Sequence, residues 1–270
     1  MLELAIRLNL SQNLISELSE LSEEKITALS EKCLREGFKP LRKESDIVRL
    51  GVILTCAVRV KDQYEKMGIS DEIYYSTMSD IKIWCDNNEG RGLKNYGWLS
   101  NHVKAELFRL GRLQFQIYPC KNKTLLYKKL PFSYGENLVY VHIPQGEKLS
   151  EEECIKSFRM AEEFFKEYFP DYIYRYYFCE SWLLFEGNKD FMKPDSNIVS
   201  FMNLFTHAYS IKVDEQAISR IFGKRKLFKK NYPENTSLQK SAKTYMQKGG
   251  KLGVGVAYID RKIFKSSLQN

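Results

Sequence analysis

Two polar clusters in the second half of the chain combine residue types that can move protons. His142 lies near the end of the run Val139–Ile143, which leads into a Pro/Gly turn, and a histidine there can be a general base near neutral pH. Glu180 and Ser181 follow the aromatic run Tyr172–Phe178. A buried Glu180 could also be a base, whereas a nucleophilic Ser181 would need a base within reach. The structural alternatives are a packed histidine, a solvated carboxylate and a structural hydroxyl.

A third cluster could hold a phosphate. Thr236 and Ser237 open a predicted helix that carries Lys240 and Lys243. The free N–H groups of a first helical turn, together with nearby lysines, attract anions. An ordinary N-cap is the alternative interpretation of Thr236 or Ser237.

The chemical motifs that are easiest to recognise do not occur in the sequence. It contains no Walker A loop, no H-E-x-x-H, no G-x-S-x-G and no G-x-G-x-x-G. The six cysteines are scattered without a C-x-x-C pair, so we expect no metal site. We expect these cysteines to be reduced and buried.

The pattern of apolar and capping residues over the first 113 residues predicts helices. Ser22 and Ser45 are suitable N-caps, and the apolar residues after Ser45 recur at intervals of three and four. We expect the helix around Val52–Val58 to be the most buried. Two more helices are predicted over 71–86 and 98–110, with Gly111 as a C-terminal cap.

The period changes after Gly111, where apolar and polar residues begin to alternate. Strands are predicted over 113–118, 125–127, 138–143, 172–178 and 254–258. Helices are predicted from a capping box at Ser150 and over 196–206, 214–222 and 237–247. The fold class is therefore α+β or α/β, with a helical N-terminal domain (1–113) and a second domain (114–270) that contains a mixed sheet with flanking helices.

The composition is that of a globular protein, and its charge is concentrated. No segment could span a membrane and no secretory signal is visible, so we expect a cytoplasmic protein. The net charge is +8, with 42 lysines and arginines against 34 acidic residues, and residues 220–270 alone carry +11. Such a field favours an anionic partner: nucleic acid, a membrane surface or a phosphorylated small molecule. We expect the small molecule and no membrane partner, and leave nucleic acid and a merely solvated basic face open.

Five segments in one order resemble a known family. They are Arg109–Phe115 (RLGRLQF), His142–Gly146 (HIPQG), Ser181–Leu184 (SWLL), Pro194–Phe201 (PDSNIVSF) and Thr236–Gln239 (TSLQ). The set resembles the GNAT-like acyltransferase domain-containing proteins, which pair a helical N-acyltransferase-type domain with a GNAT-like C-terminal domain. The resemblance implies a GNAT-like mixed sheet, acyl-CoA as donor and acyl transfer as reaction.

The resemblance also assigns a cofactor region. It implies that strand 138–143 pairs with the pantetheine arm and that loop 144–150 holds the pyrophosphate. Ile143, Gln145 and Gly146 would then contact acyl-CoA. This loop has one glycine and is followed by three glutamates, so we also expect Ser237, Lys240 and Lys243 to contact the phosphates.

The resulting hypothesis is an acyl-CoA-dependent N-acyltransferase that acts on a small-molecule or peptide amine. His142 or Glu180 would be the base, a backbone N–H near Ile143 the oxyanion donor, and Ser181 the acid. The alternative is a non-catalytic binding module that uses the basic segment on nucleic acid or another anionic partner. Steep salt dependence would distinguish the nucleic-acid binder.

Overall fold

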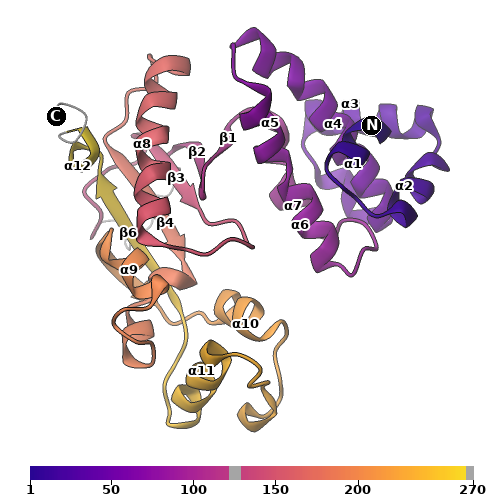
Figure 1. Ribbon diagram of the computed structural model, residues 1–270. Coiled ribbons are helices and arrows are strands. Elements are labelled where there is room, and N and C mark those ends of the chain that lie inside the picture. The colour runs from indigo at the N-terminus through magenta and orange to yellow at the C-terminus, as the bar shows by residue number, and fades with distance from the viewer. Residues whose placement is uncertain (122–128, 266–270) are drawn as a thin grey trace. The chain divides into compact units, whose positions relative to one another are not determined.

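The computed structural model describes residues 1–121 and 129–265, and the chain divides into two compact units (Figure 1). Unit 1 comprises residues 1–116, 143–147 and 164–169, and unit 2 comprises the remainder. The strand predicted over 125–127 lies outside the described residues. Each unit is built from separate segments of the chain, whereas the domains predicted from the sequence meet at one boundary after residue 113.

Unit 1 is mainly helical. Its helices are α1 (Leu2–Arg7), α2 (Gln12–Ser19), α3 (Glu23–Glu36), η1 (Lys39–Lys43), α4 (Asp46–Lys66), α5 (Asp71–Met78), α6 (Asp80–Asn87), α7 (Tyr96–Leu99) and η2 (His102–Lys104). The predicted caps are confirmed: the hydroxyls of Ser22 and Ser45 accept hydrogen bonds from the N–H groups of Lys25 and Val48. Each cap satisfies one of the free N–H groups of its helix.

Helix α4 is the core of unit 1, as its apolar sequence predicts. Leu50, Val52, Ile53 and Leu54 are fully buried, because α4 contacts α1, α2, α3 and α5 on different sides. Gly51 belongs to this packing: a Cβ there would lie 2.9 Å from a methyl carbon of Leu21. A helix that is apolar on several sides is stable only when it is surrounded in this way.

Two of the predicted helices in this region are wrong in detail. The helix predicted over 71–86 is divided at Ser79 into α5 and α6. The helix predicted over 98–110 does not exist, because its last residues form strand β1 (Leu107–Leu110), which pairs antiparallel with β2 (Leu113–Pro119). Gly111, with φ of 66°, belongs to the hairpin turn rather than to a helix cap.

Within residues 1–121 and 129–265, the sheet has six strands in the order β1-β2-β3-β4-β6-β5. The others are β3 (Asn137–His142), β4 (Tyr176–Ser181), β5 (Thr206–Ile211) and β6 (Val254–Asp260). Strands β3 and β4 are parallel, whereas β6 pairs antiparallel with both β4 and β5. The predicted mixed sheet after a helical region is therefore confirmed.

Helices and short turns connect the strands of unit 2. They are α8 (Glu151–Tyr168), η4 (Trp182–Leu184), η5 (Glu186–Asp190), α9 (Asn197–Asn203), α10 (Glu215–Phe222), η6 (Lys229–Asn231), α11 (Ser237–Gln247) and α12 (Lys262–Lys265). Figure 1 shows α8 running beside β3 and β4. The strand predicted over 172–178 is found at Tyr176–Ser181 instead. Tyr172 lies before this strand, where its hydroxyl donates to Leu138 O and accepts from Tyr118 N–H.

Candidate active site

The register of the parallel pair fixes which side chains share a face of the sheet. Leu138 is opposite Tyr176, and Tyr140 is opposite Phe178. Residues opposite each other point to the same face, and alternate residues along a strand point to opposite faces. His142 therefore shares a face with Tyr140, and Glu180 shares that same face with Phe178.

The opposite face of the sheet is covered by α8 and takes up Ser181. The ring of Tyr177 lies 5.0 Å from that of Phe158 in α8, and its hydroxyl donates to Glu162 at 2.8 Å. Ser181 has the same parity as Tyr177 and is buried. Its hydroxyl accepts the N–H of Leu183 at 3.2 Å and caps η4. The structure thus does not bring Ser181 together with His142 and Glu180.

We call the other side the aromatic face and define it by Tyr118, Tyr140, His142, Phe178 and Glu180. The Tyr140 ring stacks on His142 at 4.2 Å between centroids, and its hydroxyl donates to the backbone carbonyl of Glu180 at 3.4 Å. The Tyr118 ring lies 5.3 Å from that of Tyr140 and 6.3 Å from that of Phe178. Tyr140 is therefore the residue that touches both predicted bases.

Burial changes the acid–base properties of this face. It raises the pKa of the half-buried Glu180 carboxyl, because a carboxylate is poorly solvated there. The pKa of Tyr118 is also raised, first by burial and then by the charges of Cys120 and Glu180. A carboxyl that is protonated more easily and a phenol that keeps its proton form a suitable pair for proton transfer.

The two parallel strands stop pairing before they end. The last paired residues are Tyr140 and Phe178, while β3 continues to His142 and β4 continues to Ser181. The final residues of β4 pair with β6 instead, Glu180 being opposite Val256. His142 and Glu180 therefore lie beyond the last paired residues of β3 and β4.

The loop after β3 is held by polar contacts inside unit 1. Gln145 accepts a hydrogen bond from Asn87 at 3.0 Å, and Glu147 forms an ion pair with Arg109 at 3.1 Å. Gly146 has a φ of 120°, which favours glycine. Ile143 opens this segment and is half-buried. The roles of Ile143, Gln145 and Gly146 in cofactor binding stay predictions.

The predicted phosphate cluster on α11 is partly engaged within the protein. Lys243 has an exposed side-chain fraction of 11% and forms an ion pair with Glu234 at 2.7 Å. The N-cap is Thr236, whose hydroxyl accepts the N–H of Gln239, and Ser237 is the first helical residue. Lys240 is exposed. Phosphate binding by Ser237, Lys240 and Lys243 stays a prediction, with Lys243 already neutralised by a carboxylate.

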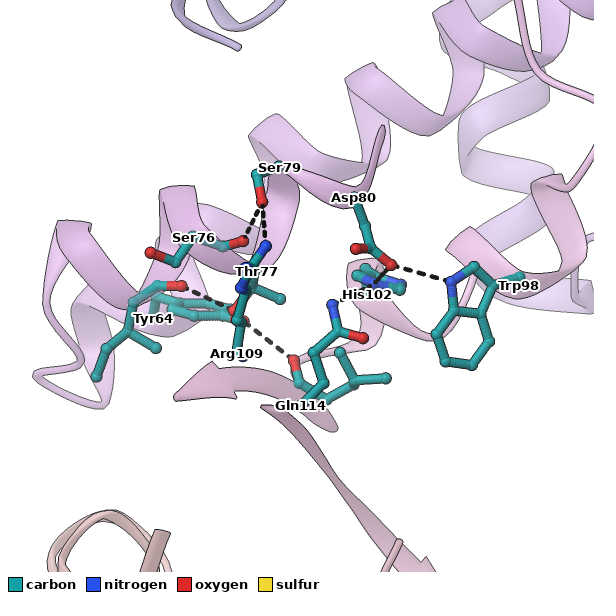
Figure 2. A network of polar contacts seen from close by, with 11 residues as sticks. Tyr64, Ser76, Thr77, Ser79, Asp80, Trp98, His102, Arg109 and Gln114 are labelled. Carbon is teal, nitrogen blue, oxygen red and sulfur yellow. Dashed lines mark hydrogen bonds and ion pairs between the residues drawn. The ribbon is translucent and has the colours of Figure 1, made fainter. Parts of the chain in front are cut away.

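A second histidine–carboxylate pair is buried inside unit 1 (Figure 2). His102 Nε2 lies 3.1 Å from Asp80 Oδ2, and the Trp98 indole N–H donates to the same oxygen at 3.1 Å. Gln114, from β2, places its side-chain nitrogen 3.4 Å from His102 Nε2. His102 and Gln114 are completely buried. The pair is therefore closed to substrate and serves the packing of the unit.

Sequence reasoning missed the two tyrosines of the aromatic face. Tyr140 lies two residues before His142 and Tyr118 lies on β2, so the alternation of strand residues could have placed Tyr140 beside His142. The contact with Tyr118 depends on neighbouring strands, which the sequence does not specify.

Neither a metal cluster nor a membrane span is found in residues 1–121 and 129–265. No group of three or more His, Cys, Asp or Glu side chains there could hold a metal ion. No helix in those ranges is long and apolar enough to cross a membrane. All six cysteines are buried, as predicted.

Comparison with known proteins identifies the two parts of the chain. Residues 107–259 match the GNAT-like C-terminal domain, and residues 2–105 match the N-acyltransferase N-terminal domain. No curated protein sequence matches the chain. Similar solved structures include an acyltransferase in complex with decanoyl-CoA and teicoplanin, and a mutant acyltransferase in complex with octanoyl-CoA. Both are 18% identical with a TM-score of 0.79, and the alignment covers 96% of this chain and 86% of theirs.

These matches confirm the predicted resemblance and, at the level of the family, the predicted acyltransferase class. The likeness to the solved structures, at 18% identity, shows the shared fold. The match to the C-terminal domain extends over more than half of the chain. The chain therefore belongs to the family with a GNAT-like C-terminal domain, preceded here by an N-acyltransferase N-terminal domain.

Proposed function

We propose that this chain transfers an acyl group from acyl-CoA to an amine, with Glu180 as the general base on the aromatic face. Family membership supports acyl transfer. The similar structures that contain decanoyl-CoA and octanoyl-CoA support an acyl-CoA donor. A complex with teicoplanin suggests an acceptor class for that relative, and for this chain we propose a small-molecule or peptide amine.

The observation that carries the proposal is the position of Glu180. Its carboxyl is half-buried at the end of the β3–β4 pairing, on the same face as His142. Burial raises its pKa toward the range in which a base is effective at neutral pH. A base whose pKa lies closer to the working pH removes a proton from an attacking amine more effectively than a fully solvated glutamate does.

His142 is the second candidate for the base. It stacks on Tyr140, the same residue whose hydroxyl reaches the backbone of Glu180. A histidine side chain can act as a general base near neutral pH. Variants at the two positions separate the candidates, since only the true base controls the proton-transfer step.

Tyr118 replaces Ser181 as the candidate acid. The hydroxyl of Ser181 caps η4 on the opposite face, whereas Tyr118 packs against Tyr140 on the aromatic face. Its raised pKa keeps the phenol protonated, so Tyr118 has a proton to donate to the sulfur as the C–S bond breaks.

The reaction balances with these residues. The amine nitrogen attacks the thioester carbonyl carbon, and Glu180 accepts the proton that the nitrogen loses. The C–S bond then breaks, the amide forms, and the thiolate takes a proton from Tyr118. Proton return from Glu180 to Tyr118 restores the starting state. Stabilisation of the oxyanion by a backbone N–H near Ile143 is part of the proposal.

Turnover with defined donors tests this function. The protein is incubated with acetyl-, octanoyl- and decanoyl-CoA, each with and without primary amines, and released CoA thiol is measured. We expect amine-dependent thiol release together with saturable binding of acyl-CoA. The proposal fails if neither CoA nor any acyl-CoA binds. Salt-sensitive binding of nucleic acid in that case would support the binding-module alternative.

A further inference from the structure

The segment between α10 and α11 carries an exposed apolar pair inside a run of basic residues. Leu227 is 89% exposed and Phe228 is 56% exposed. The ten residues 223–232 (GKRKLFKKNY) contain five lysines and arginines and no acidic residue. From this loop we propose that the chain binds the surface of an anionic phospholipid membrane through Leu227 and Phe228.

The loop is fixed at its base, so the exposure of its tip is a property of the fold. Tyr232 is buried, and its ring lies 4.4 Å from that of Phe222 at the end of α10. The Tyr232 hydroxyl accepts the N–H of Lys226 at 3.3 Å. Lys229 donates to the carbonyl of Met246 at 2.6 Å. The loop is therefore anchored to α10 and α11, while the Leu–Phe pair stays exposed.

Some basic residues of the loop bind groups within the protein, and others are exposed or half-buried. Arg225 forms an ion pair with Asp214, and Lys229 is bound to α11. Lys224 and Lys230 are exposed and Lys226 is half-buried, and no carboxylate of residues 223–232 competes for these three lysines. Each lysine near an anionic membrane surface contributes about 1 kcal/mol to binding, or a factor of about five.

The apolar pair favours a membrane over nucleic acid as the partner of this loop. A leucine offers no ring on which a base could stack, whereas adjacent leucine and phenylalanine side chains enter the boundary between headgroups and acyl chains. Peripheral binding needs no spanning helix, so the absence of one in the described ranges is compatible with it. It differs from the sequence-based expectation of no membrane partner. The inference does not depend on the proposed catalytic function.

Vesicle flotation of the full chain tests the inference. The protein is mixed with vesicles of phosphatidylcholine alone or of phosphatidylcholine with phosphatidylserine, and binding is measured at several salt concentrations. We expect binding to the anionic vesicles only, weakening as salt is added. Equal binding to both kinds of vesicle, or binding to neither, overturns the proposal.

Two sets of variants assign the binding to this loop. Lys224→Gln/Lys226→Gln/Lys230→Gln is expected to weaken binding on the order of a hundredfold, since three factors of about five are lost. Leu227→Ser/Phe228→Ser keeps every charge and is expected to weaken binding at least about tenfold. The matched control for the apolar pair is Ile173→Ser, which alters a side chain of unit 2 that is 74% exposed.

The control for charge is Lys32→Gln/Lys39→Gln/Lys94→Gln, which removes three exposed lysines of unit 1. Both controls are expected to bind vesicles like the unaltered chain. An unchanged Leu227→Ser/Phe228→Ser variant overturns the proposal, as does equal loss in the controls. Strong nucleic-acid binding that the lysine variant loses and the apolar variant keeps would also overturn it, because the loop would then bind polyanions through charge alone.

Discussion

The two regions that combine a histidine with a carboxylate differ mainly in access. In unit 1, His102 and Asp80 are in direct contact at 3.1 Å and excluded from solvent. In unit 2, His142 and Glu180 share the aromatic face and remain half-buried. The same residue types therefore stabilise a fold where solvent is excluded, and they can support chemistry where a substrate can approach. The sense of the pKa shift distinguishes them too, being downward for Asp80 and upward for Glu180.

The largest expected effect is that of Glu180→Gln on turnover. The substitution keeps the shape of the side chain and removes its basicity, so kcat is expected to fall by about 10²- to 10⁴-fold. Thiol release with saturating acyl-CoA and amine measures it. His142→Asn is the comparison: if it causes the large loss and Glu180→Gln does not, His142 is the base and the assignment of Glu180 is wrong.

For the buried pair His102 and Asp80, the expected effect of substitution is on stability. His102→Ala leaves the Asp80 carboxylate buried without its partner, which is expected to lower the free energy of unfolding by about 3–5 kcal/mol. Urea denaturation followed by tryptophan fluorescence measures it. His207→Ala is the matched control, because His207 is 26% exposed and contacts Ser210 and Glu186. Equal losses in the two variants would refute a special role for the buried pair.

The pH dependence of stability should have opposite signs in the two regions. Burial alone would raise the pKa of Asp80, but the hydrogen bond and charge of His102 outweigh it, together with Trp98 and Gln114, so the net shift is downward. Its contribution to stability is therefore present above the unfolded-state pKa, about 3.9. It is lost as the pH falls through the folded-state value. Glu180 has a raised pKa, so its contribution to stability is instead present below its unfolded-state pKa, about 4.3, and is lost as the pH rises through the folded-state value.

Urea midpoints measured from acid to neutral pH check these signs. Relative to wild type, Asp80→Asn should be increasingly destabilised as the pH rises from the acid range, and Glu180→Gln should become relatively more stable over the same rise. If both differences change in the same direction, one of the two environments is described wrongly.

Part of this comparison could be predicted from the sequence. The capping serines, the buried helix α4 and the candidate bases His142 and Glu180 follow from local patterns of polarity and period. The hairpin of β1 and β2 did not, because Leu107 and Leu110 are also spaced as in a helix, and only the pairing of this segment with β2 distinguishes a strand from a helix. The face of the sheet that Ser181 occupies could not be predicted either, because it depends on where β4 begins. The contact of Tyr118 with Tyr140 could not be predicted because it depends on the order of the strands in the sheet.

The smallest expected effect comes from removing one hydroxyl in each region. Tyr140 donates to the carbonyl of Glu180, and Tyr74 donates to the carbonyl of Ala57 at 2.8 Å in the core of unit 1. Tyr140→Phe is expected to lower kcat/KM by less than about tenfold and to leave the unfolding midpoint nearly unchanged, since a hydroxyl on the aromatic face orients the backbone of the base. Tyr74→Phe should leave kcat/KM unchanged and cost about 1 kcal/mol of stability. The two readouts are measured on both variants, and a Tyr74→Phe protein that loses activity at full stability would mean that unit 1 contributes to catalysis as well as to the fold.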